Sequence, residues 1–492
     1  MNRILLLLLF LIPSVLIPSE MEITDLIKKG LDYSYNFELE KARECFRKVI
    51  NENPDHPQGY HYLSGTYLWV YISNKKENDF NKFLKYSDMT IARAEKLLNT
   101  NDKDADVLYI LGANYGFRAM AYMKTNSQIN AVWAVKNSNK YLNETLEINS
   151  AMYDAYLGLG LFNYALSMVP GVFKWALKLA GLSGDREEGI HNLKQAYRYG
   201  DLTKTEAAYY LSQIYTETIA DYNTAIGYLR QIIKQYPGNS LFKYSYAVAL
   251  IKNRKPQEAE EILRKIIAER NPHFQQVTSF SYFLVGDILF RKNEFREAIN
   301  YYQNFLSQSQ EVDYSGIANY RMAVCYELSG DRDSAKKLYI LSRNGSDDIP
   351  DDVYARRKGE IYFDRSLSST EISLIKASNL IESGSPARAY TLLKEIVSAT
   401  GSQVLKAECF YYLSDAAYEI SRFDESLSFA EKVLSLNTGR ENWLKPYSYF
   451  LAARALEKKG NSVRADEYLK KAGDFSDFDY QNRLTSLINS LK

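Results

Sequence analysis

The stretch that decides the fold is ITDLIKKGLDYSYNFELEKARECFRKVINENPDH, residues 23–56. Its small and large apolar residues follow the order expected of two antiparallel helices that pack on one another. Gly30 and Ala42 would let the two helices approach closely, while Phe46 would fill the space between them. Pro54 predicts the end of the second helix, because proline lacks the backbone N–H that a helix needs. The stretch therefore predicts a helix pair 34 residues long.

Six positions of this stretch resemble the tetratricopeptide repeat, a 34-residue helix pair. They are Leu26, Gly30, Tyr33, Ala42, Phe46 and Pro54. The small residue near the start of the second helix recurs later at separations of 34 to 39 residues, with one separation of 54. The recurrences are Ala225, Ala259, Ala298, Ala335, Ala389, Ser426 and Ala465. The resemblance implies an all-α tetratricopeptide-repeat solenoid of about 10–11 helix pairs, each covering the apolar face of the next.

The repeats also predict how the chain is organised. We expect N-terminal repeats over 23–200, central repeats over 205–345, an irregular insertion over 346–369, C-terminal repeats over 370–474 and a capping helix over 475–492. The insertion holds Asp347, Asp348, Asp351 and Asp352 beside Pro350, which we interpret as a solvated acidic loop. The capping helix is predicted because Phe478, Tyr480, Leu484, Leu487 and Leu491 have the spacing of one apolar helix face.

Residues 1–19 have the pattern of a signal peptide. An apolar run from Ile4 to Ile17 follows Arg3, and it is shorter than the roughly 20 residues that a membrane-spanning helix requires. Ser19 is the candidate cleavage position. We therefore expect an exported protein, periplasmic or otherwise extracytoplasmic, and membrane-associated if the run stays attached.

Composition and motifs narrow the classes of function. The chain has 61 basic and 60 acidic residues, so it lacks the broad basic field that nucleic acid requires and we expect no nucleic-acid partner. Its three cysteines lie far apart in predicted helices, which argues against a disulfide framework. Its four histidines lack metal-ligand spacing, and no nucleophile elbow, zinc-protease motif or phosphate loop occurs. We expect no metal, no cofactor and no catalytic residues, although an envelope enzyme with an unrecognised site stays an alternative.

The segment from Gly158 to Gly189 departs from the plain repeat. Within it, a Gly-x-Phe-Asn stretch precedes a Leu-Ser and a proline, then an apolar segment, then Gly-Asp-Arg and a further glycine. The positions are Gly160, Phe162, Asn163, Leu166, Ser167, Pro170, Gly184, Asp185, Arg186 and Gly189. The segment resembles the inclusion-body clearance and tetratricopeptide-repeat-thirty-nine family over roughly residues 104–250. That resemblance implies an adaptor at a membrane or lipid surface, and the expected signal peptide suggests a bacterial exported relative.

Residues 165–182 form an apolar stretch that carries only Lys174 and Lys178 as charges. One interpretation is a helix that lies on a membrane interface or receives a partner helix. The other is a helix that packs back onto the solenoid, as apolar helix faces usually do. Asp185, which follows the stretch, is placed to cap the next helix.

Tyrosine is unusually frequent, with 41 residues. The first helix of each repeat lines the concave face of such a solenoid, and its second, fifth, ninth and twelfth positions predict an aromatic groove. The groove residues are Tyr209, Tyr244, Phe280, Phe283, Phe290, Tyr320, Tyr411, Tyr418, Tyr447 and Phe450. Tyrosine suits binding because its rigid ring ends in a hydrogen-bonding hydroxyl. Alternatively, many of these rings pack between repeats. We expect few lysines and arginines in the groove.

These observations predict a non-enzymatic adaptor or scaffold in the cell envelope. Its partner would be a protein peptide or helix bound in the aromatic groove, with a second contact to a membrane surface through residues 165–182. A membrane- or lipid-surface repeat protein is the first alternative.

Overall fold

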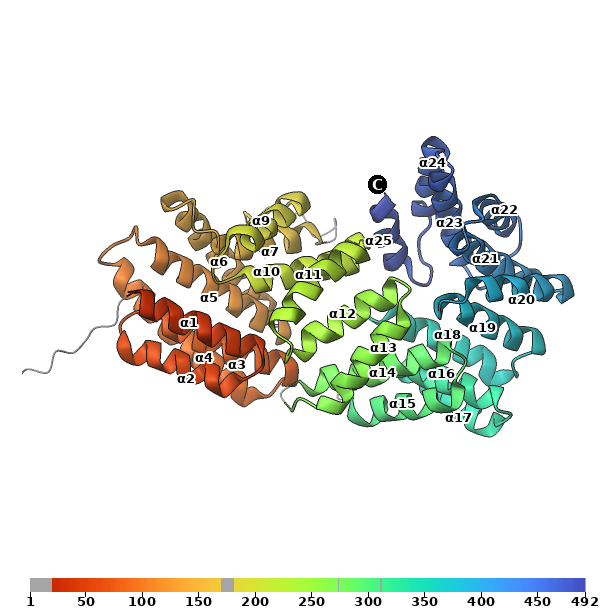
Figure 1. The fold of residues 1–492 in the computed structure, drawn as a ribbon, viewed down its shortest axis with the longest axis horizontal. Helices are drawn as coiled ribbons and strands as arrows, with labels where there is room; N and C mark the ends of the chain where they lie inside the picture. Colours follow the sequence, from red (N-terminus) through yellow and green to blue (C-terminus); the bar gives the residue numbers. More distant parts are fainter. Residues whose placement is uncertain (1–19, 170–180, 273, 310–311, 492) are drawn as a thin grey trace, which may run out of the picture. The chain divides into compact units, whose positions relative to one another are not determined.

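The computed structural model describes residues 20–169, 181–272, 274–309 and 312–491, and within these ranges the chain is helical with no strand (Figure 1). The prediction of an all-α solenoid of helix pairs is confirmed. The chain divides into two compact units, the N-terminal unit (residues 1–204) and the C-terminal unit (residues 205–492). Each unit is described by itself. The expected signal peptide, Pro170 and most of the apolar stretch 165–182 lie outside the described residues.

Four helix pairs make up the N-terminal unit. They are α1 (Glu20–Tyr35) with α2 (Leu39–Glu52), α3 (Gln58–Asn74) with α4 (Glu77–Leu98), α5 (Ala105–Lys124) with α6 (Gln128–Ile148), and α7 (Ala155–Ser167) with α9 (Arg186–Tyr199). Phe46 is fully buried between the first helices, as predicted. A methyl group at Gly30 would lie 2.4 Å from its ring, so the close approach of α1 and α2 requires glycine.

Seven further pairs form the C-terminal unit, together with two unpaired helices. The pairs are α10 (Lys204–Ile214) with α11 (Tyr222–Gln235), α12 (Ser240–Lys252) with α13 (Pro256–Glu269), α14 (Gln275–Arg291) with α15 (Phe295–Gln308), α16 (Ser315–Leu328) with α17 (Arg332–Leu341), α19 (Ser369–Glu382) with α20 (Pro386–Ala399), α21 (Gln403–Glu419) with α22 (Phe423–Leu434), and α23 (Leu444–Lys458) with α24 (Ser462–Gly473). A π-helical turn, η2 (Tyr215–Ile219), extends α10. The unpaired helices are α18 (Pro350–Asp364) and α25 (Gln481–Leu491).

The recurring small residues are the points of closest contact in these pairs. All seven of them have no exposed surface: Ala225, Ala259, Ala298, Ala335, Ala389, Ser426 and Ala465. A side chain no larger than serine at each position lets the two helices of a pair approach. The spacing of these residues therefore predicted these helix pairs correctly.

The prediction of an irregular insertion over 346–369 is wrong, because α18 is a regular helix of 15 residues that packs on α16 and α17. Pro350 starts this helix, at a position where its missing N–H costs nothing. Asp352 is fully buried, and its carboxylate accepts hydrogen bonds from the backbone N–H of Ile317 at 2.8 Å and of Ser346 at 2.9 Å. Asp352 thus fixes the turn before α18 and is not part of a solvated loop.

The C-terminal helix α25 begins at Gln481, within the range 475–492 given for a capping helix, and it contacts more than the last repeat. It packs against α23 and α24, and also against η2 in the first pair of the same unit. Leu484 and Ile488 are buried at these contacts. The helix therefore connects the first and last helix pairs of the C-terminal unit.

Among the described helices, none combines the length and apolar character needed to cross a bilayer. Cys45, Cys325 and Cys409 are buried and make no disulfide. Burial raises the pKa of the Cys409 thiol to about 12, so this side chain stays protonated and behaves as a small apolar group.

Candidate binding cavity in the C-terminal unit

Helix pairs far apart in sequence contact each other within the C-terminal unit. Gln257, at the start of α13, donates a hydrogen bond to the carbonyl oxygen of Ser383 at 3.0 Å. The side-chain amide of Asn379 on α19 lies 2.9 Å from both the carbonyl oxygen of Phe290 and the amide oxygen of Asn293. The sixth and seventh pairs of the chain therefore contact the ninth pair, and the helices between them curve around an interior space.

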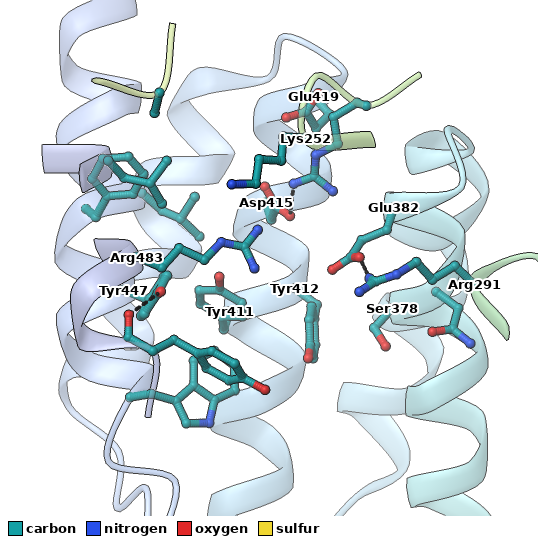
Figure 2. A pocket seen from close by; sticks show the side chains of 18 of the residues that line it. Lys252, Arg291, Ser378, Glu382, Tyr411, Tyr412, Asp415, Glu419, Tyr447 and Arg483 are labelled. Atoms are coloured by element: carbon teal, nitrogen blue, oxygen red, sulfur yellow. Dashed lines mark hydrogen bonds and ion pairs between the residues drawn. The ribbon is translucent and has the colours of Figure 1, made fainter. Parts of the chain in front are cut away.

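That space is a cavity of about 680 Å³ (Figure 2). Its lining comes from the turns after η2 and α12, from the end of α14, from α16 and α18, and from the later helices α19, α21, α23 and α25. Six of the ten aromatic residues predicted to line a groove line this cavity: Phe290, Tyr320, Tyr411, Tyr418, Tyr447 and Phe450. The volume falls in the range of small-ligand and peptide side-chain pockets.

The other four predicted groove residues do not line this cavity, and three of them pack between neighbouring helix pairs. Tyr209 contacts Phe242 with ring centroids 5.4 Å apart. Phe280 and Phe283 both pack on Tyr314, at 5.6 Å and 5.2 Å. Tyr244 is half-buried on α12, outside the cavity lining. The rings of Tyr209, Phe280 and Phe283 therefore fill interfaces between repeats, which was the alternative interpretation of the aromatic pattern.

The rings that line the cavity are held by edge-to-face contacts. Tyr411 meets Trp443 with ring centroids 4.9 Å apart and an interplanar angle of 87°, and Trp443 meets Tyr447 at 5.9 Å and 80°. Burial raises the pKa of Tyr320 to about 12, and it raises the pKa of Tyr447 as well, so both phenols stay protonated. The Tyr447 hydroxyl donates a hydrogen bond to the carbonyl oxygen of Tyr480 at 3.0 Å. The aromatic wall is therefore neutral, with its ring positions fixed before any ligand binds.

The expectation of few basic residues in the groove is wrong, because six basic side chains line the cavity: Lys252, Arg254, Arg291, Arg321, Arg454 and Arg483. Several of these follow a predicted aromatic by one or four positions, as Arg291 follows Phe290 and Arg454 follows Phe450. Positions four apart share a helix face, so the signal for Arg454 was present in the sequence. Five acidic side chains line the same cavity: Asp221, Asp351, Glu382, Asp415 and Glu419.

Most of the arginines have carboxylate partners. Arg291 pairs with Glu382, and Arg321 pairs with Asp287. The guanidinium of Arg454 stacks over the ring of Tyr418, 3.9 Å from its centroid, and lies 3.9 Å from the Glu419 carboxylate. These charges are largely compensated within the cavity wall.

Arg483 differs from the others, because no carboxylate of the described residues lies within 4.0 Å of its guanidinium. It extends from the first turn of α25 toward Tyr411 (Figure 2). Although burial opposes its charge, the surrounding Tyr447 and Asp351 raise the pKa of Arg483. The side chain is exposed to the water-accessible cavity, so it is a cation available to a ligand.

A buried charge network supports the cavity wall behind these rings. Glu441 accepts hydrogen bonds from Arg357 at 3.0 and 3.1 Å, from Lys358 at 3.0 Å and from the Trp443 indole at 2.9 Å. Arg357 also contacts Asp479 at 2.6 Å. Burial alone would raise the pKa of Glu441, but Lys358 and Arg357 hold it well below its usual range. The network joins α18 to the segments that precede α23 and α25, and no local sequence pattern indicated it.

The family-like motif residues form a close helix crossing in the N-terminal unit. A methyl group at Gly160 on α7 would lie 2.9 Å from the Gly189 carbonyl oxygen, and one at Gly189 on α9 would lie 2.6 Å from the Tyr164 nitrogen. A methyl group at Gly184 would lie 2.5 Å from the Asn163 carbonyl oxygen. The glycines therefore let the backbones of α7 and α9 touch.

The remaining described motif residues lie around that crossing. The Asp185 carboxylate accepts a hydrogen bond from the Glu188 N–H at 2.8 Å, which confirms its predicted role as the cap of α9. Arg186 is the first residue of that helix, and Phe162 lies half-buried on α7. The motif thus has a structural role in joining two helices.

No group of three or more His, Cys, Asp or Glu side chains in the described ranges is arranged to hold a metal ion. His61 is buried and stacks on Phe117 with ring centroids 4.8 Å apart. Burial lowers the pKa of His61 to about 4, which keeps it neutral.

Paired helices stacked in this way, with small residues at each crossing, define a tetratricopeptide-repeat solenoid. Within that class, the chain belongs to the Iml2/Tetratricopeptide repeat protein 39 family, which it matches over residues 82–344. It is 26% identical over 223 residues to the Inclusion body clearance protein IML2 of Pyricularia oryzae, a match that covers 41% of this chain and 27% of that protein. The chain thus spans about a quarter of the length of this curated relative.

Solved helical-repeat structures are also similar to the chain. Yeast Tom70 is 12% identical, with 96% of each chain covered and a TM-score of 0.26. The apo form of the quorum sensor NprR from B. thuringiensis is 12% identical, with 84% of this chain and 98% of that chain covered and a TM-score of 0.33.

Proposed function

We propose that this protein is a non-enzymatic scaffold that binds a segment of a protein partner in the cavity of the C-terminal unit. The observation that carries the proposal is the convergence of six predicted groove aromatics on one cavity of about 680 Å³. Membership of a tetratricopeptide-repeat family and a helical-repeat fold are consistent with a role in protein interaction.

The cavity wall favours a particular kind of segment. Rigid, neutral aromatic rings provide apolar contact area without losing much conformational freedom on binding. Six basic and five acidic side chains line the space, so its net charge is small and does not favour a strongly charged partner. Arg483 lacks a carboxylate within 4.0 Å among the described residues, and an arginine of this kind binds a carboxylate well. We therefore propose a mainly apolar segment that carries one carboxylate near Arg483.

The location that we propose is outside the cytoplasm. Its support is the apolar run from Ile4 to Ile17 after Arg3, with Ser19 as the cleavage position. Cell fractionation together with sequencing of the purified protein's N-terminus tests this location. A cytoplasmic protein that retains Met1 would contradict it.

Site-specific photocrosslinking in the native host tests the binding proposal. A photoreactive phenylalanine analogue replaces Tyr411, which is half-buried in the cavity wall. The matched control replaces Tyr199, which is 57% exposed on α9 and is not one of the residues that line the cavity. We expect one discrete crosslinked partner from position 411 and none from position 199.

A second variant connects the crosslink to the cavity charge. Arg483→Ala should weaken the crosslink from position 411, because the carboxylate of the partner loses its cation. A crosslink from position 199 alone would contradict the proposal, because binding would then lie outside the cavity. A crosslink from position 411 that Arg483→Ala leaves unchanged would also contradict it.

A further inference from the structure

The end of α5 and the start of α6 in the N-terminal unit expose four large apolar side chains. Their exposed fractions are 68% for Met123, 87% for Ile129, 44% for Val132 and 52% for Trp133. We call these four residues the hairpin patch. Single exposed apolar residues are common on proteins, but a group of four that includes tryptophan indicates a binding surface. None of the four belongs to the apolar stretch 165–182.

Helix geometry fixes how the hairpin patch is presented. Ile129, Val132 and Trp133 are three and four positions apart on α6, so they share one face. The opposite face is buried against α5 through Ala131, Ala134 and Leu142. The Trp133 ring also meets Tyr115 of α5 edge-on, with ring centroids 5.2 Å apart. The Trp133 ring is therefore held against α5 while about half of its surface stays exposed.

The part of the α5 and α6 hairpin around the patch carries charge of one sign, whereas Asp88 and Glu95 of the preceding helix α4 lie near Tyr115. Residues 107–143 contain four basic residues and no acidic residue. Arg118 is buried and paired with Asp88, whereas Lys124, Lys136 and Lys140 are exposed. Lys136 and Lys140 continue the Ile129 and Trp133 face of α6, and Lys124 ends α5 beside Met123. Lys140 lies 3.9 Å from Glu144, one turn further along the helix.

We propose that the hairpin patch docks on the surface of an anionic lipid bilayer. Isoleucine, methionine, valine and tryptophan at the tip of a helical hairpin would enter the boundary between headgroups and acyl chains, where tryptophan is favoured. The three lysines would remain at the level of the headgroups, because their long side chains reach back to charged phosphates. This arrangement matches a negatively charged surface in both its apolar tip and its basic rim.

Vesicle sedimentation of the full chain tests the proposal. One probe is vesicles of phosphatidylcholine alone. The other is vesicles with about 30% phosphatidylserine, which have the negative surface charge of a natural anionic membrane. Binding should be at least about tenfold stronger to the anionic vesicles and should weaken as salt rises, since three lysines contribute.

The double substitution Ile129→Ser with Trp133→Ser should reduce binding about tenfold or more, because burying large apolar side chains drives insertion. Lys136→Glu with Lys140→Glu should produce a similar loss on anionic vesicles only.

Matched controls come from the C-terminal unit. Val463, which is 75% exposed, provides Val463→Ser, and exposed Lys265 and Lys337 provide the paired charge reversal. Both control variants should bind as the parent chain does. A membrane-bound leader would affect every variant equally, so the difference between variants reports the patch.

Trp133 supplies a direct readout. Vesicles with brominated acyl chains should quench part of the tryptophan fluorescence of the parent chain, and Trp133→Phe should remove that part. Equal vesicle binding by the parent chain and the Ile129→Ser, Trp133→Ser variant would overturn the proposal. Equal loss in the control variants, absence of anionic-vesicle binding, or a protein that occupies the patch in place of lipid would overturn it as well.

Discussion

The Arg254 guanidinium, in the turn between α12 and α13, donates a hydrogen bond to the Oδ2 of Asp415 on α21 at 3.0 Å, across 161 residues of sequence. Asp415 raises the pKa of Arg254, as expected for a cation beside a carboxylate. Asp415 is mostly buried, and Arg254 keeps about a third of its side-chain surface (34%). The pair therefore connects the sixth and tenth helix pairs at the wall of the cavity.

A double-mutant cycle with Arg254→Ala and Asp415→Ala should measure a favourable coupling of about 0.5–1.5 kcal/mol, since the pair is only partly desolvated. Urea unfolding followed by circular dichroism provides the measurement. Lys96 and Asp55, 3.1 Å apart and both at least 70% exposed, form the control pair, with expected coupling below about 0.5 kcal/mol. Equal coupling energies in the two cycles would mean that the contact between Arg254 and Asp415 adds no more stability than an exposed ion pair.

The glycines of the family motif lead to a prediction about the N-terminal unit. Gly189→Ala should lower the free energy of unfolding by about 1–3 kcal/mol, because the added methyl group would lie 2.6 Å from the Tyr164 nitrogen and force α7 and α9 apart. Gly227→Ala is the control, since Gly227 lies inside α11 with no atom within 4 Å of the added group. That substitution should stabilise the protein by up to about 1 kcal/mol. Thermal unfolding of both variants tests whether Gly189→Ala lowers stability while Gly227→Ala raises it. Destabilisation by both substitutions would contradict the packing argument.

The sequence predicts the helix pairs because their signal is local. Each small residue near the start of a second helix, from Ala225 to Ala465, defines one face of one helix within a few residues. The cap by Asp185 is equally local, since it involves a backbone N–H three residues away. The helix pairs could therefore be predicted from local spacing, and the resemblance to the tetratricopeptide repeat supplied the fold class.

The cavity could be predicted only in part, because its closure depends on the curvature of the whole stack. Small rotations between successive pairs add up, and they determine which distant faces meet. The contact of Arg254 with Asp415 and the position of Arg483 in the cavity arise in this way. The burial of Asp352 escaped prediction for a related reason. Its partners, the N–H groups of Ile317 and Ser346, are 35 and 6 residues away, and that of Ile317 meets the carboxylate only when α16 and α18 pack together.

Glu371 predicts a dependence of stability on pH. It accepts hydrogen bonds from Arg365 at 2.7 and 2.8 Å and forms a capping box with Ser368. Although burial opposes ionisation, these partners lower the pKa of Glu371 to about 2. A carboxyl whose folded pKa is depressed stabilises the protein above its unfolded pKa of about 4.3, and this contribution is lost as the pH falls toward 2.

Glu371→Gln should therefore cost about 1–3 kcal/mol at pH 7, and the difference from the parent chain should shrink between pH 4.3 and 2. Urea midpoints measured across this range test the prediction. Glu360→Gln, at an exposed position of α18, should change stability by less than about 0.5 kcal/mol at every pH. A cost for Glu371→Gln that does not vary with pH would show that its carboxylate charge is not responsible.

The C-terminal helix α25 carries a residue of the apolar core and a residue of the cavity wall at adjacent positions. Leu484 is 2% exposed and packs in the last apolar core, whereas Arg483 beside it faces the cavity. Leu484→Ala should lower the free energy of unfolding by about 2–4 kcal/mol through the cavity it leaves.

Because α25 also packs on η2, hydrogen exchange in this variant should accelerate in α25, in η2 and in α23, at the two ends of the C-terminal unit. Arg483→Ala should leave hydrogen exchange at η2 unchanged, because among the described residues no carboxylate lies within 4.0 Å of the Arg483 guanidinium. Faster exchange in α25 without any change at η2 would mean that the helix caps the last repeat only and does not join the first pair to it.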